Sequence, residues 1–350
     1  MKPSFNPKFS YTPKIINTLS KIERLYGQIL GESLIPSLAL RLTKENQVLA
    51  THHSTSIEGN PLSPKDVTNI ILGDRLPTTK SELEVKNYFA TLNKINILVN
   101  KHEPISLALT KNLHKLLMQG LDDKSLNDFR NSSVFIGHRT KLELVVKHNP
   151  PFHSREEIEK ALSKLYSWVN EKSELHPLIK AGIMHHEFAF IHPFFDGNGR
   201  LARILTAYFL LLNQYDVAKY FILDDYYDID RSQYSDMLHS ADRRDNIKWL
   251  EYFLEGIAYS LQAAAARIND LKRKNLDDIE ADKRVLVTRR EEEVLEIIID
   301  KKAVKTNDIL DILGVTRQQA HALLASLVKK GLVQKFGSTK TSYYKLKEKK

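Results

Sequence analysis

Apolar residues recur at intervals of three and four along most of this chain, with polar residues between them. That spacing places the apolar side chains on one face of a helix, which must then be buried against other elements. It predicts helices at 13–30, 36–57, 81–99, 107–117, 154–169, 177–190, about 200–212 and about 249–274. We therefore predict a mainly α-helical fold built as a bundle.

Capping residues mark some of the predicted helix ends. Ser81 is followed three residues later by Glu84, the spacing of a capping box that opens the helix to residue 99. Gly59 and Pro61 come just after residue 57, where glycine can adopt a positive φ and proline cannot continue a helix. The second helix is therefore expected to end there.

The stretch 129–151 departs from the helical period. Two short runs of β-favouring residues, 134–136 and 142–146, flank a turn from Gly137 to Lys141. Two such runs around a glycine-containing turn predict a β-hairpin. One sequence does not fix the register of its strands.

The C-terminal part of the chain has the pattern of a separate small domain. Helices are predicted at 289–301 and 306–313, and Thr316 caps a third helix that continues to about 329. Two short strands then form a hairpin, an order that is typical of a winged helix-turn-helix. The charged stretch 275–285, poor in apolar residues, is expected to be a linker.

Composition and charge narrow the class of protein. A hydrophobic content of 42% suffices for globular cores, and the lack of cysteine excludes disulfides, thiolate nucleophiles and Cys-type zinc sites. No stretch has the length and apolarity of a membrane span or of a signal peptide, so we expect no membrane partner and a cytoplasmic location. Residues 284–350 hold 15 Lys and Arg against 8 Asp and Glu, so they carry +7 of the net +9. That asymmetry favours an acidic partner for the C-terminal domain.

DNA is one such partner. In a winged helix, Arg317, Gln318 and Gln319 would lie near the N-terminus of the third helix, which can enter the major groove. Lys335 and Lys340 in the wing would meet phosphates. Winged helices also mediate dimerisation and protein docking, so a homodimer or another protein remains an alternative partner of this domain.

Several side chains that can bind ligands or transfer protons lie close together in the stretch 191–204, I-H-P-F-F-D-G-N-G-R-L-A-R-I. His192 supplies a base that titrates near neutral pH, and Asp196 supplies a hard oxygen ligand for a cation. Gly197-Asn198-Gly199 offers backbone N–H groups, and Arg200 and Arg203 follow at helical spacing beside the positive end of a helix. The pattern predicts an anion site suited to a polyphosphate with a divalent cation.

This stretch resembles the signature H-P-F-x-D/E-G-N-G-R-x-x-R of the Fic (filamentation induced by cAMP) family, and residues 192–203 match every defined position. The resemblance implies protein adenylylation (AMPylation), the transfer of AMP from ATP to a Ser, Thr or Tyr hydroxyl of a target protein, with Mg²⁺. His192 would take the proton of that hydroxyl, and Asp196 would hold Mg²⁺. Relatives that transfer a phosphoryl group carry Lys where this chain has Gly199, so glycine favours nucleotidyl transfer.

The resemblance also assigns the nucleotide-binding residues. The amides of Gly197, Asn198 and Gly199 and the side chain of Arg200 would bind the α- and β-phosphates, and Arg203 would orient the γ-phosphate. Tyr234 could stack on adenine, although a tyrosine that packs in the core is an equally good interpretation.

The predicted hairpin corresponds to the flap of Fic proteins, which holds a segment of the target by main-chain pairing. Its residues would be Val134, Phe135, Ile136 and Gly137. A hairpin with a purely structural role is the alternative.

The end of the second helix carries another resemblance. Residues 54–59, S-T-S-I-E-G, resemble the inhibitory motif S/T-x-x-x-E-G/N of Fic proteins that restrain themselves from an N-terminal helix. Glu58, one turn after Ser54, could reach Arg203 and occupy the place of the γ-phosphate. The alternative is an ordinary helix end with a solvated glutamate.

We therefore expect a Fic helical bundle with a small hairpin flap, followed by a winged helix. The expected division is an N-terminal helical region at 1–95 with the inhibitory helix at about 36–58, a catalytic domain at 96–274, the linker at 275–285 and the winged helix at 286–350. Other nucleotidyl transfer and removal of AMP from a modified target remain open as activities. A DNA-binding regulator that uses its Fic domain as a nucleotide sensor is the alternative of a different class.

Overall fold

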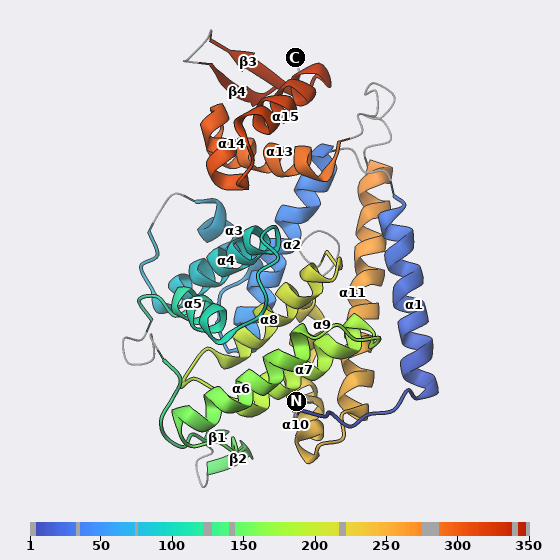
Figure 1. Ribbon diagram of the computed structural model, residues 1–350, viewed down its shortest axis with the longest axis vertical. Helices are drawn as coiled ribbons and strands as arrows, with labels where there is room; N and C mark the ends of the chain where they lie inside the picture. The colour runs from blue at the N-terminus through green and yellow to red at the C-terminus, as the bar shows by residue number, and fades with distance from the viewer. Residues whose placement is uncertain are drawn as a thin grey trace. The chain divides into compact units, whose positions relative to one another are not determined.

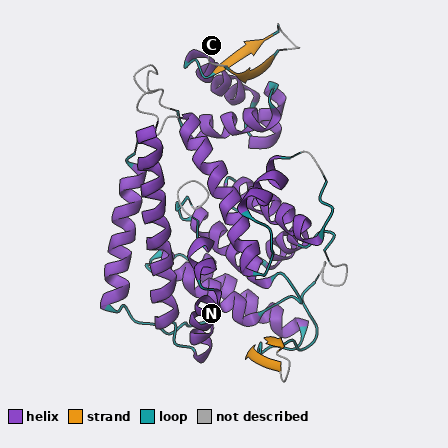
Figure 2. Ribbon diagram, turned by 180° about the vertical axis from the view of Figure 1, so that it is seen from behind, coloured by secondary structure: helices purple, strands orange, loops and turns teal. Residues whose placement is uncertain are grey.

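The computed structural model describes residues 5–32, 36–73, 76–121, 128–139, 144–216, 222–274, 287–337 and 342–347. Helices make up most of this part of the chain, and its strands belong to two short hairpins (Figure 2). No helix in the described ranges is long and apolar enough to cross a membrane. The mainly helical fold predicted from the hydrophobic pattern is therefore confirmed.

The chain forms two compact units, one of Met1–Gly31 with Thr43–Ile268 and one of Glu32–Leu42 with Asn269–Lys350. The first 95 residues were expected to form a region of their own. Instead, α4 (Lys80–Val99) packs against α8 (Asn198–Leu212), so the N-terminal helices share a core with the stretch that contains the motif. A few residues at the start of α2 (Pro36–Ile57) fall in the second unit.

Figure 1 labels the remaining α-helices of the first unit. They are α1 (Pro13–Leu30), α3 (Pro64–Leu72), α5 (Leu107–Leu117), α6 (Arg155–Asn170), α7 (Pro177–Ile191), α9 (Asp224–Ile229), α10 (Arg231–Ser240) and α11 (Ile247–Lys274), which ends in the second unit. The 3-10 turn η1 (Ala241–Arg243) lies between α10 and α11. Most of these bounds match the predicted ranges within one or two residues.

Helices α7 and α8 form the centre of the first unit. Residues 178–188 of α7 are buried without exception, because this helix is apolar on all sides. Helix α8 packs against α7, α4 and α5 and buries Leu201, Ile204 and Tyr208. The loop between the two helices carries residues 192–197, so the burial of both helices fixes the position of the motif.

Close packing of α7 against α11 depends on Gly182. A Cβ atom at this position would meet the side chains of Leu250 and Phe253. The carbonyl oxygen of Gly182 also accepts a hydrogen bond of 2.7 Å from the indole N–H of Trp249. Glycine therefore lets the backbone of α7 approach its neighbour.

The N-terminus of α4 differs from the predicted one. The capping box consists of Thr79 and Glu82, not Ser81 and Glu84. The Glu82 carboxylate accepts hydrogen bonds from the backbone N–H groups of Thr78 and Thr79. Glu84 instead accepts a hydrogen bond of 2.9 Å from Asn60, so its tertiary contact removes it from the local cap.

The predicted hairpin is present, but its strands lie about two residues further along. Strand β1 (Ile136–Arg139) pairs antiparallel with β2 (Leu144–His148), and the register shifts between Ile136 and Gly137. Gly137 pairs with Val146, so it belongs to the strand rather than to the predicted turn. Residues 140–143 lie outside the described ranges.

The second unit contains the elements predicted for a winged helix, in the same order. They are α13 (Arg289–Lys301), α14 (Thr306–Leu313), α15 (Arg317–Lys329), β3 (Val333–Phe336) and β4 (Tyr343–Leu346). Thr316 caps α15 as expected, and β3 pairs antiparallel with β4. The core is formed by apolar residues of all three helices, such as Val294, Ile309 and Leu324. The predicted linker lies within the undescribed residues 275–286.

The cap of α4 gives a direct test of this fold. Thr79→Ala should lower the free energy of unfolding by about 1 kcal/mol, because it removes the acceptor of the Glu82 N–H group. Ser81→Ala, the matched control, should change it by less than about 0.5 kcal/mol. Urea denaturation followed by circular dichroism measures both values. A cost at Ser81 equal to that at Thr79 would contradict the observed cap.

Candidate functional site

The loop between α7 and α8 is held by buried contacts. Helix α7 ends where His192 adopts a left-handed conformation, with φ 50°. Asn198 accepts a hydrogen bond of 2.9 Å from the N–H of Phe194 and donates one of 2.8 Å to its carbonyl oxygen. The Phe194 ring stacks on His114 at 3.6 Å, and Nε2 of His114 lies 3.0 Å from the carbonyl oxygen of Asp196. Asn198 and His114 thus fix the loop, so the Asn198 side chain has a positioning role.

Arg130 holds the same loop from the other side. Its guanidinium donates to the carbonyl oxygens of His192 at 2.7 Å, Ile191 at 3.2 Å and Ser132 at 2.6 Å. Its backbone N–H also donates to Pro193 at 2.9 Å. Sequence reasoning did not identify Arg130 or assign this role to His114, because these contacts join residues more than 60 positions apart and no motif marks them.

His192 is suited to accept a proton. Burial lowers the pKa of its imidazole to about 4, and the positive charge of Arg130 acts in the same direction. The ring is therefore neutral at neutral pH, and it carries a free lone pair on one nitrogen. A neutral imidazole is the form that a general base requires.

The N-terminus of α8 offers groups that fit a phosphate and a cation. Gly197 occupies the N-cap with φ 78°, and the first N–H groups of a helix have no partner within it. The Asp196 side chain is 50% exposed and accepts a hydrogen bond from the Gly197 N–H. Arg200 is buried, and its Nε and Nη1 atoms have no hydrogen-bond partner. Arg200 Nη2 pairs with Asp196 Oδ1 at 3.3 Å, and its Nη1 lies 3.8 Å from Glu84 Oε1. Buried donors without a hydrogen bond next to carboxylates fit a phosphate with a divalent cation.

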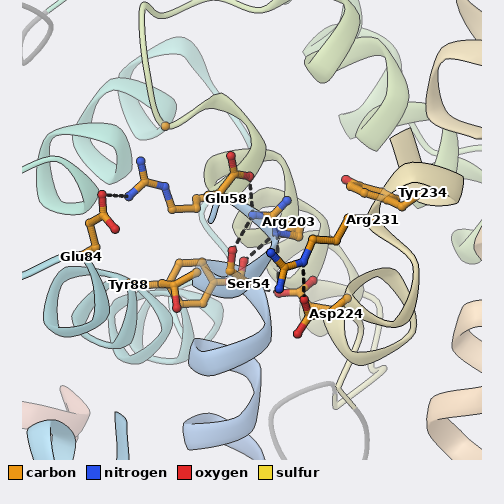
Figure 3. A network of polar contacts seen from close by, with 12 residues as sticks. Ser54, Glu58, Glu84, Tyr88, Arg203, Asp224, Arg231 and Tyr234 are labelled. Atoms are coloured by element: carbon orange, nitrogen blue, oxygen red, sulfur yellow. Dashed lines mark hydrogen bonds and ion pairs between the residues drawn. The ribbon is translucent and has the colours of Figure 1, made fainter. Parts of the chain in front are cut away.

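Arg203 is the centre of a second group of contacts (Figure 3). Its side chain is only 1% exposed and donates to Ser54 Oγ at 2.6 Å, to the Ser54 carbonyl oxygen at 2.9 Å and to Glu58 Oε1 at 2.7 Å. Burial alone would lower the pKa of Arg203, but Glu58 and further partners raise it above its usual value. The structure thus joins the end of α2 to α8, as the sequence predicted.

The Glu58 carboxylate lies directly over the first turn of α8. A Cβ atom at residue 199 would clash with Glu58 Oε1, so glycine is required for this approach. The Glu58 side chain is 37% exposed, whereas Arg203 beneath it is buried. A solvated helix end, the alternative considered for this glutamate, does not describe an ion pair of this kind.

Two acidic groups and a tyrosine extend the contacts around Arg203. Asp224 Oδ2 lies 3.8 Å from Arg203 Nε and accepts a hydrogen bond from the Tyr88 hydroxyl. Burial raises the pKa of Asp224, while the charge of Arg203 opposes that shift. Arg231 pairs with Asp228 and donates to Ser56 of α2, so α10 also holds the end of α2. No motif or periodicity in the chain predicts these contacts.

Tyr234 lies in the core, which is one of the two interpretations that the sequence left open. Its ring is buried and stacks on Tyr227 at 4.4 Å, and its hydroxyl lies 2.9 Å from Nε2 of His185. These contacts favour the core-packing interpretation over stacking on adenine, because the ring already has an aromatic neighbour and its hydroxyl a polar one.

The flap and C-terminal candidates are mostly exposed. Phe135 is exposed next to β1, and Ile136 and Gly137 lie in that strand, with Val134 half-buried before it. In the second unit, three candidates are exposed at the start of α15 and one on β3: Arg317, Gln318, Gln319 and Lys335. The Gln319 side chain accepts a hydrogen bond from the Thr316 N–H in the capping box. Lys340 lies outside the described residues.

Comparison with known proteins gives the family of this site. Residues 104–210, which include α5, the flap, α6, α7 and most of α8, match the model of the Fic/DOC family. This part of the chain is therefore similar to Fic domains. Residues 290–341 match the model of a FaeA-like protein.

Curated relatives resemble the part of the chain around the Fic domain. Protein adenylyltransferase Fic of Aedes aegypti is 31% identical over 172 residues, which cover 47% of this chain and 32% of that protein. Protein adenylyltransferase fic-1 of Caenorhabditis elegans is 29% identical over 172 residues, with the same coverage of both chains. The match thus spans about a third of the length of these relatives.

Solved structures extend the likeness to nearly the whole chain. A Fic family protein from Desulfovibrio desulfuricans G20 is similar over 99% of both chains, with a TM-score of 0.63 and 25% identity. Fic-1 from C. elegans matches over 73% of both chains, with a TM-score of 0.60 and 23% identity. The second likeness concerns the fold alone.

The role of Arg130 can be tested through stability. Arg130→Met should lower the free energy of unfolding by about 3 kcal/mol, because it leaves buried carbonyl oxygens without their donors. Arg155→Met is the matched control, since its guanidinium is 47% exposed and pairs with Asp128, and it should cost less than about 1 kcal/mol. Urea denaturation measures both variants. Equal costs would refute a special role of Arg130 in holding the loop.

Proposed function

We propose that the Fic domain transfers AMP from ATP to a hydroxyl group of a target protein. The main support is the neutral, half-buried His192 beside the N-terminus of α8 and two buried arginines. This arrangement offers a base together with positive groups for a polyphosphate. Relatives named protein adenylyltransferase carry the same kind of domain, which supports this activity over a sensor without chemistry.

In the proposed reaction, the hydroxyl oxygen of the target attacks the α-phosphorus of ATP. The bond from that phosphorus to the bridging oxygen of pyrophosphate breaks, and the hydroxyl proton passes to His192. Backbone N–H groups at Gly197–Gly199 and the unpaired donors of Arg200 would neutralise the charge that develops on the phosphates. Asp196 would hold Mg²⁺, which supplies charge neutralisation for the leaving pyrophosphate.

Target recognition is assigned to the hairpin. A main-chain edge can hold an extended segment in register and present its Ser, Thr or Tyr hydroxyl to His192. The candidate edge is the start of β1, which directly follows the exposed Phe135. This mode selects a backbone conformation more strongly than a side-chain sequence.

Labelled nucleotides test the chemistry. With ATP labelled at the α-phosphate, purified protein and cell lysate should give covalently labelled protein, and γ-labelled ATP should give none. His192→Ala should abolish labelling, whereas His102→Asn, a change at an exposed histidine, should leave it unchanged. Labelling from γ-labelled ATP would refute nucleotidyl transfer. Labelling from UTP alone, or release of AMP from a modified target, would replace adenylylation by another reaction at the same site.

We further propose that Glu58 restrains the Fic domain. Its carboxylate accepts a hydrogen bond from the buried Arg203 guanidinium. The γ-phosphate of ATP is also an anion and would bind the same guanidinium. The contacts of Ser54 with Arg203 and of Ser56 with Arg231 hold α2 in the position from which Glu58 reaches the site. ATP would therefore have to displace Glu58 from Arg203 to bind in the reactive position.

Substitution at Glu58 should activate the protein. Glu58→Gly should increase α-label incorporation at least tenfold, and Glu58→Gln should give a smaller increase because it removes the charge but keeps most of the volume. Glu156→Gln, at an exposed position of α6, is the control and should have no effect. Calorimetry should show that Glu58→Gly strengthens ATP binding more than AMP binding, because AMP lacks the γ-phosphate. Equal gains for both nucleotides would contradict competition at Arg203.

The C-terminal unit has DNA as its candidate ligand. Arg317 and Gln318 are exposed at the start of α15, and the segment from residue 284 carries +7. These groups would contact base edges and phosphates of a duplex. A docking surface for protein is the alternative.

A gel-shift series tests this assignment. Random duplex DNA should bind at low salt and be released as salt increases, because phosphate contacts release counterions. Arg317→Ala should weaken binding severalfold, whereas Lys329→Ala, at the other end of the same helix, should have a smaller effect. Absence of binding at low salt would favour docking of a protein.

A further inference from the structure

Four side chains meet at a place that the proposed reaction does not use. They come from the end of β2, from α7, from the last turn of α10 and from η1: His148, His186, His239 and Asp242. Asp242 Oδ2 lies 2.7 Å from His148 Nδ1 and 3.2 Å from His239 Nδ1. Asp242 Oδ1 lies 3.0 Å from His186 Nε2. A single carboxylate thus faces three imidazoles.

The orientation of His148 shows that a cation is needed here. Its Nε2 lies 3.0 Å from the carbonyl oxygen of Phe190, which can only accept, so Nε2 carries the hydrogen. In a neutral ring, Nδ1 then has a lone pair that faces an Asp242 oxygen with lone pairs of its own. Only a positive centre between them, either a proton or a metal ion, makes this contact favourable.

A proton satisfies this arrangement less well than a metal ion. The His148 and His239 rings are stacked, with centroids 5.0 Å apart and planes at 20°, and both direct Nδ1 at the same carboxylate oxygen. If each ring carried a hydrogen on Nδ1, His148 would be positive, because its Nε2 also carries one, and this positive ring would be stacked on His239. A metal ion lets both rings remain neutral, because it accepts a lone pair from each of them.

The distances and the outer contacts suit zinc. Nδ1 of His148, Nδ1 of His239 and a carboxylate oxygen of Asp242 all lie within 4.8 Å of one another. Tetrahedral zinc holds such atoms at about 2.0–2.2 Å from the ion, so small movements would bring them into place. Phe190 accepts the other N–H of His148, and His186 holds the second oxygen of Asp242. Hydrogen bonds of this kind usually orient the ligands of a metal.

The site is also accessible. The His148 side chain is only 3% exposed, whereas those of His239 and Asp242 are 21% and 20% exposed. An ion can therefore enter from the side of α10, and a water molecule can serve as the fourth ligand.

We propose that His148, His239 and Asp242 bind a Zn²⁺ ion. His186 positions the Asp242 carboxylate, and water completes the coordination. Because His148 ends the second strand of the hairpin, the ion ties this strand to α7 and α10. This site is separate from Asp196 and requires neither ATP nor a target protein.

Zinc binding can be measured on the untagged full-length chain after chelator treatment. Calorimetry with Zn²⁺ should show one strong site per chain, and the melting temperature should rise as zinc is added. Co²⁺ in place of zinc should give the visible absorption bands of a tetrahedral ion. His239→Ala and Asp242→Asn should abolish the strong site, and His186→Gln should weaken it by about 10–100-fold.

A matched control exists in the same unit. The described residues contain a second group of this kind, His52, His53 and Asp228, in which His53 lies 2.9 Å from Asp228. His53→Ala should leave strong zinc binding and the Co²⁺ spectrum unchanged. Circular dichroism establishes that each variant is folded. No strong site in the wild type, or loss of binding in His53→Ala with retention in His239→Ala, would overturn the proposal.

Discussion

A fully buried guanidinium at the centre of the first unit needs partners. Arg203 is removed from water on the inner side of α8, and an unpaired charge in such a place would cost several kcal/mol. Ser54 and Glu58 supply its hydrogen bonds, and Asp224 lies nearby as a second anion. These partners belong to α2 and to the start of α9, so one charge connects segments that are almost 150 residues apart. The same charge makes this place attractive to any anion.

A second buried arginine has a different function in the same region. Arg130 donates to backbone carbonyl oxygens of the loop, which are fixed partners within the chain. Arg203 pairs with a side-chain carboxylate, which is an exchangeable partner. One arginine therefore fixes the frame of the site, and the other offers a charge for which Glu58 and a phosphate can compete. The difference arises from the partners, since both guanidiniums are equally buried.

The hairpin is connected to this frame through histidines. His148 is the last residue of β2 and contacts both the end of α7 and the carboxylate of Asp242. The segment proposed to hold a target is thus joined to the helix that delivers the base. An ion at Asp242 would strengthen this connection without taking part in the chemistry.

Local sequence determined much of this protein. The helical period predicted the bounds of α1, α2 and α13, because the spacing of apolar residues along the chain defines a continuous apolar helix face. The motif at 192–203 and the partnership of Glu58 with Arg203 followed from a resemblance that lies in short stretches. Tertiary structure decided the rest. Glu84 binds Asn60 instead of capping α4, and Tyr234 packs in the aromatic core. Arg130, His114 and Asp242 bind partners that are distant in the sequence. Such contacts depend on which helices pack together, and no periodicity within a single element encodes that choice.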